Sequence, residues 1–208
     1  MTSARCPRAG AARRMFMIGL ALCAAPALLF AKPSAPKKPA VTLDLYVMSQ
    51  CPFGTKAENV IFPAVRSLGP LVDFNLYFIA NEAVGEQGLP TFKSLHGQPE
   101  VDENIRHLCA QQHAPKLYMD FILERNLSNA TAADWQAAAK KAGIDPAALG
   151  ACAGGEEGKK LFSENIKFAE QRKAGASPTI DINGAQYRGA RSVRGVTLAL
   201  CDALQAAG

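Results

Sequence analysis

The chain has 208 residues, of which 49% are hydrophobic and 20% are charged, and its formal net charge is +5. Its length suits one domain with a substantial core. The positive charge comes mainly from residues 1–31, which hold four arginines and no acidic residue. Because the rest of the chain is close to neutral and has no basic stripe, nucleic acid is not an expected partner.

The first 31 residues are typical of an export signal. Their arginines form a basic region, and an apolar stretch from Met15 to Ala31 follows and ends in a small residue. The signal fits Sec export, although Arg13-Arg14 also fits the twin-arginine type. The apolar stretch reaches the lower limit for spanning a bilayer, so an uncleaved leader is the alternative and would be the sole membrane contact.

These features predict the domain organisation and the location of the protein. Residues 1–31 are expected to be a signal peptide, residues 32–40 a Pro/Lys linker, and residues 41–208 one domain. The domain is expected in the bacterial periplasm or outside the cell. In such a compartment, paired cysteines are oxidised.

A single cysteine follows the first predicted strand of this domain. The apolar run Val41–Met48 predicts a buried strand, and apolar residues at spacings of three and four predict a helix from about Pro52 to Leu68. Cys51 therefore lies where a strand ends and a helix begins. The free N–H groups and the helix dipole favour a thiolate there, which would make Cys51 a catalytic nucleophile. The alternative is a buried or disulfide-paired structural cysteine.

The remaining elements complete an α/β pattern. A strand is predicted over residues 72–79, a loop over 81–99, and a block of several helices over about 100–174. A strand at 179–182, the turn Asn183-Gly184 and a helix from Val193 to Ala206 end the chain. The order β-α-β, helices, β-hairpin, α resembles a thioredoxin fold with a large helical insertion.

Ser177-Pro178-Thr179 stands directly before the third strand of the predicted sheet. In thioredoxin-like proteins a proline at this place is cis and lies beside the nucleophilic cysteine. The alternative is a trans proline that starts an edge strand. In the cis arrangement an extended peptide could pair with the backbone of Ser177. The expected substrate groove is formed by two groups of three residues: Pro52, Phe53 and Gly54, and Ser177, Pro178 and Thr179.

A second motif runs from His96-Gly97 through Glu100 and Asn104 to Cys109. With this spacing it resembles the signature of gamma-interferon-inducible lysosomal thiol reductase (GILT), and the segment from Ser177 to Cys201 is similar to bacterial DsbA-like, GILT-like proteins. Three positions depart from the signature: Ser94 and Val101 replace cysteines and Leu95 replaces glutamine. The resemblance implies thiol–disulfide exchange on protein or peptide disulfides, with an external thiol or redox partner and without a cofactor. The matching residues are His96, Gly97, Glu100, Asn104 and Cys109.

Gly54 occupies the position of the resolving cysteine in the Cys-x-x-Cys motif of such oxidoreductases. A mixed disulfide at Cys51 would then need an external thiol, or another cysteine brought close, for its release. This favours a monothiol reductase or isomerase. The second hypothesis is a non-catalytic peptide-binding or chaperone-like module that uses the same groove.

Three further cysteines lie in the predicted domain. Cys109 and Cys152 flank the helical block, and a structural disulfide between them is the first expectation; pairing of Cys201 with one of them is the rival. Cys109 and His113 are four residues apart and could share a helix face. A metal site would need two more ligands, so no metal is predicted, and a metal-binding protein is the third hypothesis.

Overall fold

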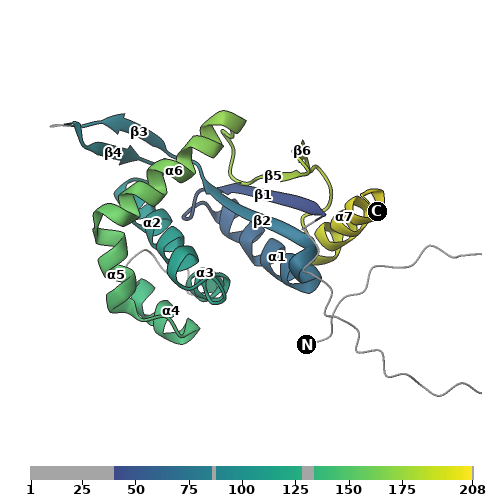
Figure 1. Ribbon diagram of the computed structural model, residues 1–208, viewed down its shortest axis with the longest axis horizontal. Coiled ribbons are helices and arrows are strands. Elements are labelled where there is room, and N and C mark those ends of the chain that lie inside the picture. Colours follow the sequence, from purple (N-terminus) through teal and green to yellow (C-terminus); the bar gives the residue numbers. More distant parts are fainter. Residues whose placement is uncertain (1–39, 86–87, 128–133, 208) are drawn as a thin grey trace, which may run out of the picture.

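A four-stranded sheet forms the centre of the protein in the computed structural model, which describes residues 40–85, 88–127 and 134–207 (Figure 1). Its strand order is β2-β1-β5-β6. β1 (Val41–Val47) pairs in parallel with β2 (Val72–Phe78) and antiparallel with β5 (Thr179–Ile182). The short β6 (Ala185–Gln186) pairs antiparallel with β5. The expected signal peptide lies outside the described residues, as does the expected linker up to residue 39.

A helix connects the two parallel strands, as the sequence predicts. α1 (Pro52–Leu68) buries an apolar stripe that includes Ile61 and Val65. It ends at Gly69, whose φ of 56° is favourable mainly for glycine. A 3-10 turn, η1 (Gly69–Leu71), then leads into β2. The resulting β-α-β unit places the first residue of α1 just after the carboxyl end of β1.

The predicted loop at residues 81–99 is wrong in part. β3 (Asn81–Val84) and β4 (Pro90–Lys93) form an antiparallel hairpin that projects from the sheet (Figure 1). All four residues of β3 are exposed. Because no face of this strand is buried, its sequence has no apolar alternation that would reveal it.

The predicted helical block lies between β4 and β5. Its last helix returns the chain to the sheet, where Phe168 stacks on Tyr77 with 4.8 Å between ring centroids. The breaks expected near Pro115, at residues 143–146 and at residues 154–155 all separate helices; the break expected at residues 126–129 lies partly outside the described residues. In the described part of this segment, which leaves out residues 128–133, five helices lie between β4 and β5: α2 (Gln98–His113), α3 (Tyr118–Leu127), α4 (Trp135–Ala142), α5 (Pro146–Gly154) and α6 (Glu156–Arg172).

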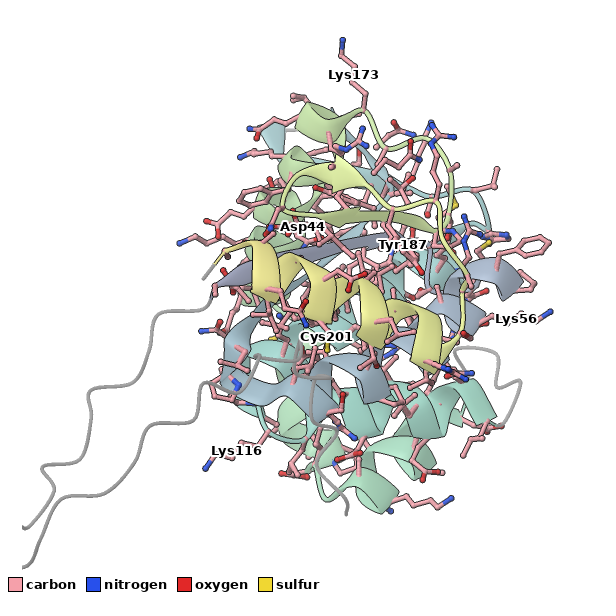
Figure 2. The ribbon with its side chains drawn as sticks, turned by 90° about the vertical axis from the view of Figure 1, so that its right-hand side faces the viewer. Asp44, Lys56, Lys116, Lys173, Tyr187 and Cys201 are labelled. Atoms are coloured by element: carbon pink, nitrogen blue, oxygen red, sulfur yellow. A yellow bond between two sulfur atoms is a disulfide. The ribbon has the colours of Figure 1, made fainter. Side chains whose placement is uncertain are left out.

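The C-terminal hairpin and helix follow the sequence prediction. Asn183 and Gly184 both have positive φ, 50° and 76°, and turn the chain between β5 and β6. α7 (Val193–Ala206) then packs beside α1, in front of the sheet in Figure 2. Among the described residues, no helix has both the length and the apolar character to cross a membrane.

The two faces of the sheet are covered by different helices. Leu43, Leu45 and Val47 of β1 belong to one buried cluster together with residues of α1 and α7. Tyr46, which alternates with them, packs in a smaller cluster with Ala169 of α6. β1 is thus buried on both faces, and this fixes the position of the loop that follows it.

Candidate active site

Cys51 is the N-cap residue of α1. Its thiol is partly exposed and is the free cysteine among the residues that the structure describes. The side chain makes no capping hydrogen bond, and Pro52 occupies the first helical position, where its missing N–H costs nothing. The free N–H groups of the first turn therefore have no side-chain acceptor at the cap. This arrangement suits a negatively charged sulfur.

The loop before β5 lies against this thiol. The Ser177–Pro178 peptide bond is cis, and the Cys51 Sγ lies 3.7 Å from the carbonyl oxygen of Ser177. The hydroxyl of Ser177 accepts a 2.9 Å hydrogen bond from the N–H of Met48, the first residue after β1. Thr179 donates from its hydroxyl to the carbonyl of Ala176 at 2.8 Å. These bonds hold the loop and the thiol in one arrangement.

Gly54 packs directly against the same loop. A Cβ at this position would lie 2.7 Å from the Ser177 Oγ and 2.8 Å from the carbonyl oxygen of Met48. Contacts below 3.0 Å are essentially never made by a real Cβ, so a side chain here would force a shift. The Ser177 hydroxyl therefore lies in the space beside residue 54, where a resolving cysteine would begin. No such cysteine is present at this position.

Pro52 and Phe53, the other two predicted groove residues of the first turn, are exposed. Phe53 is 65% exposed, and the Lys56 Nζ lies 5.9 Å from the centre of its ring. A hollow of about 460 Å³ has Met48, Ser94 and Leu95 among its lining residues. It offers a surface next to the end of β1 that a peptide chain could follow.

Glu100, a residue of the family signature, supports the loop that carries the thiol. Its carboxylate is fully buried, and its Oε1 accepts a 2.9 Å hydrogen bond from the main-chain N–H of Gln50. The His96 Nδ1 lies 2.9 Å from the same oxygen. The hydroxyl of Ser94, which replaces a signature cysteine, donates to the other oxygen. One carboxylate thus joins the residue before Cys51 to the segment that leads into α2.

Asn104 supports the same loop one helical turn further on. Its Oδ1 accepts a 3.4 Å hydrogen bond from the N–H of Ser49, a fully buried residue. Gly97 is the N-cap of α2 with a φ of 81°, and its carbonyl accepts from the N–H of Glu100. The matched signature residues therefore gather around the loop at residues 49–51, with the exception of Cys109 further along α2.

A buried charge cluster on the same helix was not predicted from the sequence. The Glu103 carboxylate contacts Arg106 at 2.7 Å and Arg125 at 2.9 Å, and its Oε1 lies 3.1 Å from the His107 Nε2. Burial would raise the pKa of Glu103, but the His107 hydrogen bond and the arginine charges outweigh it and lower that pKa to about 2. Burial lowers the pKa of His107. The spacing of Glu103, Arg106 and His107 along one helix is a readable signal, whereas Arg125 comes from α3.

The structure forms the first of the two disulfides considered, between Cys109 and Cys152 with a Cα–Cα distance of 6.0 Å. The rival pairing is therefore absent. Cys201 is buried on α7 (Figure 2), and its sulfur is also engaged in a disulfide. Within the described ranges, three potential metal ligands come together: His113, Cys152 and Glu157. The Cys109–His113 pair proposed from sequence is thus only part of a larger group.

A thiol at the start of the first helix, facing a cis-proline loop on this sheet, defines a thioredoxin fold with a helical insertion. The family model described as gamma interferon inducible lysosomal thiol reductase (GILT) matches residues 42–141, so the chain resembles this family over that segment. The predicted resemblance and the predicted fold class are both confirmed. No curated protein matches the chain.

Solved structures show the same fold at low sequence identity. BdbD from Bacillus subtilis is 15% identical, with a TM-score of 0.62 over 80% of this chain and 89% of its own. The thiol-disulfide exchange protein alpha-DsbA2 from Wolbachia pipientis is 13% identical, with a TM-score of 0.59 over 79% and 81%. A periplasmic thioredoxin-like protein from Salmonella enterica serovar Typhimurium is 17% identical, with a TM-score of 0.59 over 85% and 94%.

Proposed function

We propose that the protein is an exported thiol–disulfide oxidoreductase of the reductase or isomerase type, with Cys51 as its single nucleophile. The observation that carries the proposal is a free thiol at the N-terminus of α1, 3.7 Å from the carbonyl oxygen of Ser177. Its substrates are disulfides in proteins or extended peptides. The thioredoxin fold and the GILT match support the general class of reaction.

The reaction begins when the Cys51 thiolate attacks one sulfur of a substrate disulfide. A mixed disulfide forms, and the other substrate sulfur leaves as a thiolate. In isomerisation, that thiolate or another substrate thiol later attacks the mixed disulfide and releases Cys51 without net electron transfer. In reduction, an external thiolate attacks the Cys51 sulfur, and the substrate sulfur leaves as a thiolate. A second external thiol then attacks the external sulfur bound to Cys51, which frees the Cys51 thiolate and leaves the two external thiols joined as a disulfide. Gly54 provides no internal thiol for that step.

The substrate chain is expected to lie along the cis-proline loop. The Ser177 carbonyl faces the thiol and the Ser177 hydroxyl is already occupied by Met48, so the main chain rather than the side chain of this residue is available for pairing. The exposed Phe53 ring and the hollow next to Met48 offer apolar contacts on either side. Such contacts select extended, partly unfolded segments over compact surfaces.

Export to the periplasm or beyond is part of this proposal. It is supported by the basic and apolar pattern of residues 1–31. The similar Salmonella protein is described as periplasmic. Expression in a Gram-negative host, followed by fractionation and N-terminal sequencing, tests it: we expect a mature protein that starts near residue 32 in the periplasmic fraction.

Thiol chemistry is tested by alkylation and by turnover of a peptide disulfide with glutathione. We expect wild type to be alkylated rapidly at mildly acidic pH and to reduce the substrate only when glutathione is present. Cys51→Ser should lose both activities. The matched control is Cys51→Ser/Ser67→Cys, which keeps one free thiol but moves it to the far end of α1. Equal reactivity of the moved thiol would disprove the special role of position 51.

The second candidate is a binding module without turnover. The tight packing of Gly54 against Ser177 favours it, because the site leaves no room for a resolving thiol. If the protein is such a module, wild type and Cys51→Ser should protect unfolded peptides from aggregation equally well. The turnover assay and the aggregation assay, run on the same two proteins, therefore separate the candidates.

A further inference from the structure

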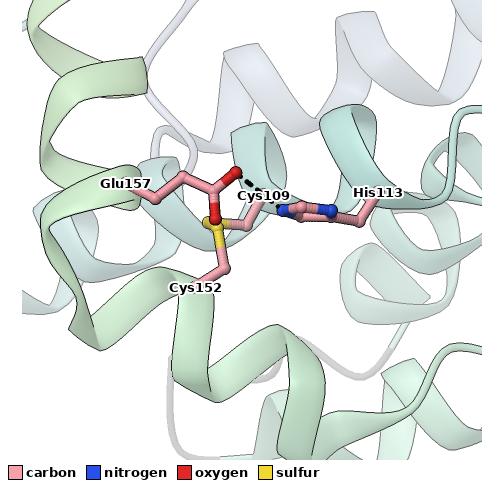
Figure 3. Close-up of a disulfide and its surroundings, with 4 residues drawn as sticks. All are labelled: Cys109, His113, Cys152 and Glu157. Atoms are coloured by element: carbon pink, nitrogen blue, oxygen red, sulfur yellow. Dashed lines mark hydrogen bonds and ion pairs between the residues drawn. A yellow bond between two sulfur atoms is a disulfide. The ribbon is translucent and has the colours of Figure 1, made fainter.

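Four side chains with metal-binding atoms meet at the far end of α2. Cys109 and His113 are one helical turn apart on α2, Cys152 comes from α5, and Glu157 comes from the first turn of α6 (Figure 3). The ligand atoms of His113, Cys152 and Glu157 all lie within 4.8 Å of one another. The fourth, the Cys109 sulfur, is bonded to Cys152.

His113 and Glu157 are already held together without a metal. The His113 Nε2 lies 2.9 Å from the Glu157 Oε1, and both side chains are about half exposed. The two sulfurs, in contrast, are buried and carry no charge while the disulfide persists. Only after reduction could they act as thiolate ligands, because a thiolate is the form that binds metal.

We propose that reduction of the Cys109–Cys152 disulfide converts this group into a zinc-binding site with the ligands Cys109, Cys152, His113 and Glu157. Two thiolates, one imidazole and one carboxylate are all established zinc ligands, and four ligands match the tetrahedral geometry of the ion. The Cys109–His113 pair needed two more ligands to form a metal site. Cys152 of α5 and Glu157 of α6 supply them.

A cavity gives reductant and metal access to the sulfurs. It has a volume of about 1110 Å³ and is lined by all four proposed ligands, with Lys116 and Leu149 among its other walls. The two sulfurs must move apart to bind one ion. α5 and α6 meet at Gly154-Gly155. A Cβ at Gly154 would meet nothing within 4 Å, whereas one at Gly155 would lie 3.0 Å from the Ala151 carbonyl oxygen, so the free space for adjustment lies at Gly154.

The chemistry balances with a dithiol as the reductant. The dithiol gives two electrons and two protons to the disulfide, becomes a disulfide itself, and leaves Cys109 and Cys152 as thiols. Zinc binding then releases one proton from each thiol to solvent. A small-molecule disulfide can reverse the process: it takes two electrons, becomes two thiolates, re-forms the Cys109–Cys152 bond and so releases the ion. The site would therefore respond to the redox state of its surroundings.

The experiment uses the full chain with Cys6, Cys23, Cys51 and Cys201 replaced by alanine, which leaves only the two proposed cysteine ligands. The wild-type chain is measured alongside. Each protein is reduced anaerobically with a phosphine, freed of reductant and titrated with Co²⁺ and then Zn²⁺. We expect one metal per reduced chain, a cobalt–thiolate charge-transfer band with tetrahedral d–d bands, and no binding by the oxidised protein.

Two substitutions at exposed ligands distinguish a built site from adventitious thiol binding. His113→Ala and Glu157→Gln should each weaken zinc binding by at least about 10-fold, since even outer-shell partners of a metal contribute that much. Glu164→Gln, at an exposed glutamate further along α6, is the control and should have no effect. Circular dichroism records whether the reduced chain stays folded. Binding that is absent, or equal in all of these variants, or equal in the oxidised protein, would overturn the proposal.

Discussion

The main-chain N–H of Gln50 donates a 2.9 Å hydrogen bond to the Oε1 of Glu100, a carboxylate with no exposed surface. Gln50 directly precedes Cys51, and Glu100 begins α2 in the helical insertion. The helical insertion therefore contacts the main chain of the loop that carries Cys51, through the side chain of Glu100. Glu100 is a positioning residue in this arrangement, because it acts on Cys51 only through the loop.

Removal of the Glu100 carboxylate should disturb the site more than the fold around it. Glu100→Ala leaves the N–H of Gln50 and the hydroxyl of Ser94 without their acceptor. Because both groups are only partly buried, the loss of unfolding free energy should be at the low end of the range for unpaired buried groups, about 1 kcal/mol for each. Glu100→Gln keeps one acceptor oxygen and should recover part of this loss.

Urea unfolding and the alkylation rate of Cys51 measure the two effects in Glu100 variants. A purely structural role would lower stability and leave the alkylation rate of the folded protein unchanged. A positioning role changes the rate as well, and Glu100→Gln restores it in part. Glu164→Gln, on the outer face of α6, serves as the control and should match wild type in both measurements.

Gly54→Ala should destabilise the protein by about 1–3 kcal/mol, because the new methyl group overlaps the Ser177 hydroxyl and the Met48 carbonyl. Gly154→Ala is the matched control: its methyl group meets nothing within 4 Å, and alanine favours a helix. Chemical denaturation of both variants checks the difference. Equal stability of the two would show that the contact at Gly54 relaxes freely.

Glu58 on α1 should make the protein less stable as pH rises through 7. Burial raises the pKa of Glu58 to about 7, despite opposing effects of the Asn126 hydrogen bond and the Arg125 charge. A raised carboxyl pKa means that the folded state holds a proton which the unfolded state releases near pH 4.5. The resulting stability is present in full below that pH and is lost as pH rises to about 7.

Glu58→Gln removes this dependence because the amide does not ionise. Between pH 4.5 and 8, wild type should lose roughly 3 kcal/mol of unfolding free energy relative to the variant, as an order of magnitude from a shift of this size. Urea unfolding over this pH range measures it. Parallel pH profiles of the two proteins would contradict an uncharged, buried Glu58.

Glu103 should show the opposite pH dependence. Its pKa of about 2 lies below the usual value of 4.5, so its ion pairs stabilise the fold above pH 4.5 and lose that effect as pH falls toward 2. Glu103→Gln should cost about 3–5 kcal/mol at neutral pH, because Arg106 and Arg125 are left buried without their anion. Acid unfolding of wild type and variant should converge near pH 2.

The sequence predicted the elements whose signals lie within one segment. Cys51 follows an apolar strand and precedes a helical pattern, and Pro178 directly precedes a strand, so both could be placed at the carboxyl end of β1 and the start of β5. The pairing of Cys109 with Cys152 was also expected, because the two flank the helical block.

Contacts between distant segments could not be derived in the same way. The resemblance pointed to Glu100, but its bond to Gln50 depends on how α2 packs against the end of β1. Arg125 reaches Glu103 only because α3 turns back on α2. The β3–β4 hairpin was missed because all four residues of β3 are exposed and β4 is only four residues long. The overlap of Ser177 with the space at Gly54 exists only in three dimensions.

The Ser177 hydroxyl limits which residues can replace Gly54. A second cysteine cannot be gained at position 54 by one substitution without a clash, since its Cβ would meet that hydroxyl at 2.7 Å and a main-chain oxygen at 2.8 Å. A two-cysteine motif therefore requires both the Ser177 hydroxyl and the Met48 carbonyl to move. The first of these neighbours lies 123 positions away in sequence.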